Sequence, residues 1–504
     1  MKLENFNSLI ELFFHQTEKH DPKSILLQWL NPNNNKTFTW EETKTNIFKL
    51  SKTIKENIEQ GDRCLLVSEN RPEWFISDLA IMLSGGITVP AYTTYTKNDY
   101  KYLIEDCEPT IIIVSNNDML KKLNTTINEK NFIKKVITFD EVEKAHHNLN
   151  IKNKEKYLDF NSIIKNDLFE KDKIQHSNLK RSSAACIIYT SGTGGNPKGV
   201  ILSHGGILNN LVGACEIMKP LIDSRPIFLT WLPLSHSYEH CVQFAQIAVG
   251  AKVFYAEKIE KLLDNISEAK PTIMTAVPRF YQNLYNKINI NMKKQTGFKA
   301  KLINATIRLG KKRLLNEKMT FFEKLLNYSV EILVRKKIKK QFGGNLKAFI
   351  SGGGALDKEI GEFLNSIGLP TLQGYGLTET SPVVSCNPIH KIKVDTVGPP
   401  FKGNKVKIAE DGEILVKGEN VMLGYWNKKE ETANVIKDGW LYTGDIGEID
   451  PEDGYLKITD RKKDIIVNAG GDNISPAKIE NMITNEIEID QCMVYGDKKN
   501  YLVA

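Results

Sequence analysis

Short apolar strands alternate with helical segments through much of this chain, and few architectures accommodate that pattern. The first run begins at Gly61, and the pattern resumes at Ala184. Parallel strands need a long crossover between neighbours, so strands separated by helices are typical of βαβ units. The sequence therefore predicts an α/β core. Its expected strands span residues 63–68, 87–91, 110–115, 135–139, 184–188, 227–231, 252–255, 272–276 and 348–350.

The remaining segments differ from this core in the composition and pattern of their residues. The first 60 residues show helical patterns around a short extended piece, and residues 141–180 are polar, which predicts a surface excursion. After Gly398, Asp-Gly and Gly-Glu turns separate short strands, which indicates an all-β unit. A last strand, helix and strand are expected at 464–467, 476–488 and 492–495. A chain of 504 residues is expected to form about three folding units.

Residues 293–340 form a strongly basic block. They contain 15 Lys and Arg residues against three Glu residues, a net charge of +12 in a chain whose total is +7. Apolar residues recur through the block in a way that suits long amphipathic helices. Two interpretations stay open: a solvated helical hairpin over the core, or a patch for a membrane surface or an anionic ligand.

Composition argues against several other classes of protein. Hydrophobic residues make up 41% of the chain and charged residues 26%, as in globular proteins and unlike disordered or fibrous ones. No apolar run approaches the roughly 18 residues that span a bilayer. The start lacks a signal-peptide pattern and the seven cysteines form no C-x-x-C pair, so we expect a cytoplasmic protein with reduced thiols. The mild charge of +7 does not indicate a nucleic-acid partner.

The segment Tyr189–Gly199, YTSGTGGNPKG, carries the clearest chemical signal. Its glycines let backbone N–H groups converge on one point, its hydroxyls add donors, and Lys198 supplies a cation. Such a loop suits the phosphates of a nucleoside triphosphate; the alternative is a Gly/Ser surface loop. A Walker A loop is excluded, because it ends in G-K-[ST] and this segment ends in P-K-G.

A second segment, GYGLTET at 374–380, offers a flat ring in Tyr375, a hydroxyl in Thr378 and an oxygen for Mg²⁺ in Glu379. Shortly before it, the glycine run Gly352–Gly354 would let a ligand lie close against the backbone. Taken alone, the second segment is a weak signal, because a strand-to-turn junction gives a similar pattern.

Two further segments place polar groups near expected strands. Asp445, which ends GWLYTGD, suits the paired hydroxyls of a ribose, and Arg461 in DRKKD could donate to the same hydroxyls. An exposed acidic turn and a solvated charge run are the alternatives for these two pieces. His236 lies in LPLSHSYE, where a core histidine is the alternative to a functional one.

Together and in this order, the segments resemble those of the adenylate-forming superfamily, and within it those of bacterial long-chain fatty-acyl-CoA synthetases. The resemblance extends from residue 7 onward and also rests on GDR…SENRPEW at 61–74 and GDNISP at 471–476. It implies an adenylation domain at 1–460, with the basic insertion at 293–340 and a distorted β-barrel at about 398–460. A small α+β lid domain would begin at residue 461.

The resemblance implies a ligase that acts in two steps. A fatty carboxylate attacks the α-phosphate of ATP to give acyl-AMP and pyrophosphate, and the thiol of CoA then displaces AMP. Thr378 would contact the α-phosphate, Glu379 and Thr193 would bind Mg²⁺, and His236 would border the acyl carboxylate. Lys463 would be the hinge of the lid. The residues implied in nucleotide binding are Thr190, Ser191, Gly192, Thr193, Lys198, Gly352, Gly353, Gly354, Tyr375, Gly376, Asp445 and Arg461.

Two departures from the family pattern affect these expectations. The phosphate loop usually reads T-S-G-T-T-G, and Gly194 removes one hydroxyl donor. The chain also ends at Ala504, before the position of a lysine that bridges carboxylate and α-phosphate in the family. We therefore expect an incomplete lid and an activity impaired by roughly 10²–10³.

The expected partners are a fatty acid, ATP and CoA, with peripheral contact of 293–340 to an anionic membrane surface at the inner face as the sharper interpretation of the basic block. Alternatives for the function are an acyl-AMP or acyl-carrier-protein ligase and an impaired binder of adenylate or acyl groups. Acyl chain length and oligomeric state stay open.

Overall fold

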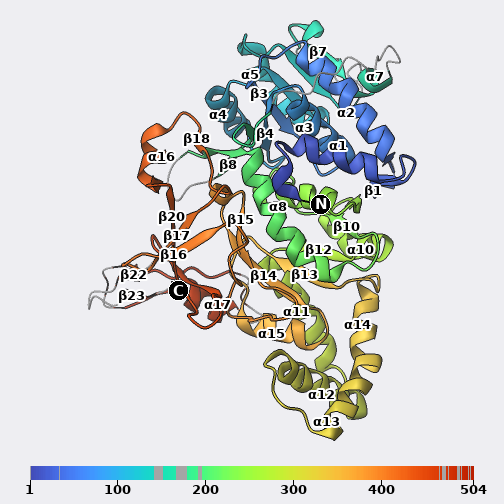
Figure 1. Cartoon of the computed structure of the whole chain (residues 1–504), viewed down its shortest axis with the longest axis vertical. Coiled ribbons are helices and arrows are strands. Elements are labelled where there is room, and N and C mark those ends of the chain that lie inside the picture. Colours follow the sequence, from blue (N-terminus) through green and yellow to red (C-terminus); the bar gives the residue numbers. More distant parts are fainter. Residues whose placement is uncertain are drawn as a thin grey trace. The chain divides into compact units, whose positions relative to one another are not determined.

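The computed structural model describes residues 2–32, 35–140, 151–165, 179–190, 196–464, 466–467, 473–474, 476–484, 489, 491–497, 499 and 501–504. The chain divides into two compact units. The first unit holds Met1–Met274, Thr378–Pro382 and Glu419–Thr432, and the second holds Thr275–Leu377, Val383–Gly418 and Ala433–Ala504. Figure 1 shows the chain with many of its helices and strands labelled.

An eight-stranded sheet forms a large part of the first unit. Its strands are β3 Arg63–Val67, β4 Ile87–Ala91, β5 Ile111–Val114, β6 Lys135–Thr138, β7 Tyr157–Asp159, β8 Ala184–Thr190, β9 Lys198–Ser203 and β18 Gly424–Tyr425. The order is β18-β9-β8-β4-β3-β5-β6-β7. The pairs from β8 to β7 are parallel, which confirms the predicted α/β core, and β9 is antiparallel to β8.

Helices α3 Pro72–Leu83, α4 Lys97–Cys107 and α5 Asn117–Glu129 connect successive strands of this sheet (Figure 1). Their apolar residues pack on strands in which most residues are buried, and Leu65, Val89 and Ile112 have no exposed area. A near-continuous apolar strand of this kind is typical of a parallel sheet covered by helices.

The prediction of a polar surface excursion at 141–180 was wrong for its middle part. Strand β7 pairs in parallel with β6 and leads into α7 Phe160–Lys165, with Phe160 fully buried. The sequence pattern does not indicate β7, because a three-residue edge strand among polar residues is too short to show a periodicity. Residues 141–150 and 166–178 lie outside the described part of the chain.

A second set of strands in the first unit consists of β1 Ile25–Trp29, β2 Thr37–Thr39, β10 Ile227–Thr230, β11 Lys252–Tyr255 and the start of β12 Ile273–Ala276. β10 lies between β11 and β12, and β11 pairs with β1. The helices of this unit also include α1 Leu9–Lys19, α2 Trp40–Lys55, α8 His204–Met218, α9 Ser237–Ala248 and α10 Leu262–Ala269. Helix α2 begins with a capping box between Thr39 and Glu42, which satisfies two backbone donors.

The second unit combines a short α/β portion with an antiparallel sheet. Strands β13 Ala348–Ser351 and β14 Thr371–Gly376 are parallel, and α15 Lys358–Ser366 connects them. The antiparallel sheet contains β16 Lys405–Ile408, β17 Glu413–Lys417, β19 Ile436–Lys437, β20 Trp440–Ile449 and β21 Leu456–Arg461. It confirms the β-rich region expected after Gly398. β15 Val383–Cys386 pairs with β14, and β22 Ile466–Val467, β23 Asn473–Ile474 and α17 Pro476–Thr484 follow the sheet.

The basic block is helical, as predicted. It begins at the end of α11 Pro278–Lys293 and continues as α12 Gly297–Leu314, α13 Phe321–Val330, a π-helix at Glu331–Arg335 and α14 Lys336–Gln341. Among the residues that the structure describes, no helix has both the length and the apolar character needed to cross a membrane.

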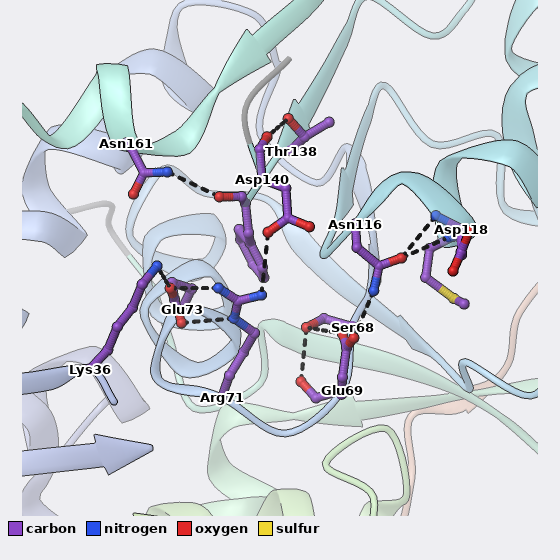
Figure 2. A network of polar contacts seen from close by, with 12 residues as sticks. Lys36, Ser68, Glu69, Arg71, Glu73, Asn116, Asp118, Thr138, Asp140 and Asn161 are labelled. Atoms are coloured by element: carbon purple, nitrogen blue, oxygen red, sulfur yellow. Dashed lines mark hydrogen bonds and ion pairs between the residues drawn. The ribbon is translucent and has the colours of Figure 1, made fainter. Parts of the chain in front are cut away.

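A buried ion-pair network lies just after β3 in the first unit. Figure 2 shows the guanidinium of Arg71 directed at Glu73 and Asp140, and Lys36 directed at the same Glu73. Arg71 donates to both oxygens of Glu73 at 2.9 Å, and its guanidinium lies over the rings of Trp29 and Phe139. Burial opposes ionisation of Glu73, but the hydrogen bonds from Arg71 outweigh it and hold the pKa of Glu73 below its ordinary value.

Two buried histidines should give the unfolding free energy a maximum near pH 6.5. Burial lowers the pKa of His204 to about 3. Burial also opposes the charge of His240, but Asp78, 2.8 Å away, and Cys186 raise its pKa to about 10. Below about pH 6.5, His204 becomes protonated in the unfolded chain but stays neutral in the folded chain. The unfolding free energy therefore falls by about 1.4 kcal/mol for each unit by which the pH is lowered. Above about pH 6.5 stability falls again, because the unfolded chain loses the proton that folded His240 keeps up to pH 10.

Urea unfolding across this pH range measures both slopes. His204→Gln should flatten the acidic slope and leave the alkaline slope in place. An acidic slope that persists in this variant would assign it to other groups.

Candidate active site

The predicted phosphate loop connects two strands of the first unit. Thr190 ends β8 and Lys198 begins β9, and the two residues are paired across the antiparallel ladder. Ser191, Gly192 and Thr193, which were predicted to bind phosphate or Mg²⁺, lie outside the described residues. Strands β8 and β9 therefore fix the two ends of the loop, and Lys198 lies at the end that begins β9.

Lys198 has a carboxylate partner that no sequence motif indicates. Its ammonium group forms an ion pair with Glu431, and it lies 5.1 Å from the centre of the Tyr425 ring. The hydrogen bond from Lys198 lowers the pKa of Glu431. Both partners come from the segment 419–432, which approaches β9 because β18 pairs with it.

Tyr425 also reaches the second predicted segment. Its hydroxyl donates to Oε1 of Glu379 at 2.8 Å, and the backbone oxygen of Glu379 accepts from Met422 at 2.8 Å. Burial, together with the neighbouring carboxylate of Glu379, raises the pKa of Tyr425 far above its usual range, so the hydroxyl stays a donor. Tyr425 thus brings Lys198 and Glu379, two residues predicted independently, to the same side chain.

Thr378 lies beside the loop that carries His236. The hydroxyls of Thr378 and Ser237 are 3.0 Å apart. His236 caps α9, and its Nδ1 accepts from the backbone N–H of Tyr238 at 3.1 Å, which leaves Nε2 to carry the proton of a neutral ring. The side chain is exposed, so His236 is not a core histidine. The buried histidine of this helix is His240.

Asn70 holds the same loop and was not singled out as a site residue. Its amide nitrogen donates to the backbone oxygen of Leu232 at 2.6 Å, and its amide oxygen accepts from the backbone N–H of Leu234 at 3.0 Å. Two bonds from one planar side chain fix the turn that precedes His236. Asn70 follows β3 within SENRPEW, one of the motifs that carry the family resemblance.

In the second unit, the predicted ribose and adenine residues lie together. The hydroxyl of Tyr375 donates to Oδ2 of Asp445 at 2.6 Å. Arg461 is paired with Asp445 across β20 and β21, and its Nε lies 3.5 Å from Oδ1. Asp445 is only 7% exposed, whereas the side chain of Arg461 is half exposed. The carboxylate is therefore held between a half-buried phenol and an accessible guanidinium.

The glycine run follows β13 in the same unit. Gly352 is buried and donates its N–H to the backbone oxygen of Ala276, while Gly353 and Gly354 are exposed. Gly353 has a φ of +79°, a conformation that side chains with a Cβ rarely adopt. Gly376 is exposed at the end of β14. Gly353, Gly354 and Gly376 therefore expose backbone without a side chain, whereas the backbone of Gly352 is buried.

The expected hinge lies next to a cluster of charges. Lys463 is exposed, and its neighbour Lys462 bonds to Asp411 at 2.6 Å and to Glu413 at 2.8 Å. The other oxygen of Glu413 accepts from the backbone N–H of Gly444 at 2.8 Å. Glu413 thus joins Lys462, next to the expected hinge, to the turn that carries Asp445, a connection that no local sequence pattern indicates.

Mg²⁺ is compatible with this set of residues. Within the described residues, no group of three or more His, Cys, Asp or Glu side chains could hold a metal ion. Mg²⁺ does not require such a group, because it is commonly bound by one or two carboxylates together with substrate phosphates. The single carboxylate of Glu379, oriented by Tyr425, fits that role.

Comparison with known proteins identifies the family. Residues 13–426 match the family described as AMP-binding enzyme. The chain is 31% identical over 468 residues to the long-chain-fatty-acid–CoA ligase FadD15 of Mycobacterium bovis, covering 90% of this chain and 74% of that protein. It is 30% identical over 494 residues to long chain acyl-CoA synthetase 3 of Arabidopsis thaliana, covering 92% of this chain and 72% of that protein.

The fold is also that of a solved ligase. The crystal structure of the anthranilate CoA ligase AuaEII in complex with anthranoyl-AMP superposes with a TM-score of 0.76 at 19% identity, over 98% of this chain and 86% of that one. The chain therefore has an adenylate-forming fold, on which Lys198, Glu379 and Asp445 lie. The chain belongs to the AMP-binding enzyme family.

Proposed function

We propose that the protein activates a long-chain fatty acid with ATP and transfers the acyl group to CoA. The arrangement of Lys198, Thr378 and Glu379 around Tyr425 and Ser237 carries the proposal, because it gathers a cation, a hydroxyl and a carboxylate within one unit. The names of the relatives favour a long-chain fatty acid and CoA as the other substrates.

In the first half-reaction, a carboxylate oxygen of the fatty acid forms a bond to the α-phosphorus of ATP, and the bond from that phosphorus to pyrophosphate breaks. Both reactants are anionic, so alignment and charge neutralisation dominate the barrier. Lys198 and Thr190 would hold the phosphates, Thr378 would donate to the α-phosphate, and His236 would border the carboxylate. When bound, Mg²⁺ at Glu379 supplies charge neutralisation of the triphosphate.

The residues of the second unit would bind the nucleoside. Tyr375 would lie against adenine, while Asp445 would accept from the ribose hydroxyls through the oxygen nearer to Arg461. Gly352–Gly354 and Gly376 would line the adenine and acyl sites.

In the second half-reaction, the CoA sulfur bonds to the acyl carbon and AMP leaves. Lys463 would be the hinge of the lid domain, which begins at residue 461, between the two steps.

An ATP–pyrophosphate exchange assay with a panel of carboxylic acids tests the proposal. Exchange is expected to require a fatty acid, and its rate should increase with the length of the saturated chain. Addition of CoA should release AMP with formation of a thioester. Exchange driven only by an aromatic or amino acid would reject the fatty-acid assignment. AMP release that needs a carrier protein in place of CoA would reassign the acceptor.

The ion pair of Lys198 gives a separate prediction about ATP. Glu431 competes with phosphate oxygens for the same ammonium group, so Glu431→Gln should lower the KM for ATP by about two- to fivefold, the range of a partly exposed ion pair. The nearby Lys428→Gln, which also touches Glu431, serves as the control and should change the KM less. A raised KM in Glu431→Gln would instead mean that the carboxylate positions Lys198.

We further propose that the basic block at 293–340 contacts an anionic membrane surface, where a long-chain fatty acid would be most concentrated. Its charge of +12 supports this interpretation. Electrostatic attraction of this kind contributes about 1 kcal/mol per basic residue near a negative surface.

A further inference from the structure

Helix α13 and the π-helix that follows it present a stripe of large apolar side chains to solvent. Phe321 and Phe322 are 78% and 79% exposed, and Tyr328 is 67% exposed. The first, fifth and eighth residues of α13 belong to the stripe, which is the spacing of one helix face. The stripe consists of Phe321, Phe322, Leu325, Tyr328, Ile332 and Leu333.

The opposite face of these helices is already bound to protein. Val330 and Arg335 are fully buried, and Arg335 donates to the backbone oxygens of Thr306 and Ser366 at 3.1 and 3.0 Å. Helix α12 approaches α15 so closely that a Cβ at Gly310 would lie 2.3 Å from the backbone oxygen of Ser366. The exposed stripe is therefore a second apolar face, additional to the one that fastens the hairpin.

Two of the three acidic residues of the block are neutralised between its helices. Glu323 accepts from Arg308 at 2.6 Å and from Lys312 at 2.9 Å. Glu331 pairs with Arg335 at 3.2 Å and with Arg313 at 3.7 Å. The charges that stay exposed around the stripe are consequently almost all positive. They include Lys318, Lys324, Lys336, Lys337 and Lys340.

We infer that this stripe is the face that inserts into an anionic lipid surface, with the surrounding lysines at the level of the headgroups. The inference rests on the membrane contact proposed above and names the side chains that make it. An amphipathic helix with aromatic and aliphatic residues on one face and lysines beside them is the form that lies in a membrane interface. A second copy of the chain is a poorer occupant, because a symmetric contact through the stripe would bring two strongly basic blocks together.

Flotation with vesicles of phosphatidylcholine containing about 30% phosphatidylglycerol tests the inference on the full chain. The Phe321→Ser/Phe322→Ser double variant should reduce the partition coefficient about tenfold or more. Its matched control is Ile259→Ser/Leu263→Ser, which removes two exposed apolar residues of the first unit and should have little effect. Lys324→Gln/Lys336→Gln should reduce partitioning about fivefold per charge, and Lys97→Gln/Lys101→Gln on α4 should not.

The outcomes separate this inference from the proposals on which it rests. If the wild type binds anionic vesicles and the phenylalanine variant binds equally well, the membrane contact survives but the stripe is not its inserting face. Equal binding to pure phosphatidylcholine, or none to either vesicle, overturns the contact itself. A dimer without lipid that the phenylalanine variant abolishes would assign the stripe to a second copy. Fatty-acid-dependent pyrophosphate exchange without vesicles should be unchanged in every variant, and its absence in the wild type would count against the proposed activity alone.

Discussion

Glu73→Gln is expected to lower the free energy of unfolding by about 3–5 kcal/mol, because it leaves a buried guanidinium without its carboxylate. Arg71 is only 3% exposed and Glu73 is fully buried, so water cannot replace the lost partner. Asp140 is 4.0 Å from Arg71 and half exposed, too distant to take over both hydrogen bonds. Urea unfolding at neutral pH, followed by circular dichroism, measures the loss.

A matched variant distinguishes burial from ion pairing as such. Glu105 pairs with Lys130 at 2.7 Å on the surface of the same unit, and Glu105→Gln should leave the urea midpoint nearly unchanged. Replacing both buried partners, as Arg71→Met/Glu73→Leu, should recover part of the stability, since the buried guanidinium charge is removed together with its carboxylate, and Lys36, whose side chain is 24% exposed, can reach water. Equal losses in Glu73→Gln and Glu105→Gln would contradict the account.

The sequence predicted those parts of the fold whose signal is local. The strands at 63–67, 87–91, 111–114 and 135–138 lie within a residue or two of their expected bounds, because buried parallel strands are runs of apolar residues between helices. Strand β1 was not singled out, and its pairing with β11 joins residues more than 200 positions apart. Pairing between residues so far apart produces no recognisable pattern within a short stretch of the sequence.

The same distinction applies to the candidate site. Glu379 and Lys198 occur in recognisable motifs and could be named from sequence. Tyr425, Glu431 and Asn70 could not, because each acts through a contact with a segment distant in the chain. Two adjacent aromatic residues at 425–426 are the one local sequence feature that could have indicated Tyr425.

Glu379→Gln is expected to have the largest effect on activity, lowering kcat for fatty-acid-dependent pyrophosphate exchange by about 10²–10³. The substitution keeps size and hydrogen-bonding capacity but removes the charge that we propose to hold Mg²⁺. A higher Mg²⁺ concentration should therefore restore part of the rate in this variant. Steady-state exchange at several Mg²⁺ concentrations, with circular dichroism to verify folding, measures both effects.

Tyr425→Phe provides the control that separates charge from position. It keeps the ring beneath Lys198 and removes only the hydroxyl that donates to Glu379, so the carboxylate stays charged but loses one anchor. We expect a loss of about tenfold, the order of one hydrogen bond to a charged group. Because the charge remains, added Mg²⁺ should rescue Tyr425→Phe much less than Glu379→Gln. Identical losses with identical Mg²⁺ dependence in the two variants would mean that Glu379 acts only by holding Tyr425 in place, and that the metal is bound elsewhere.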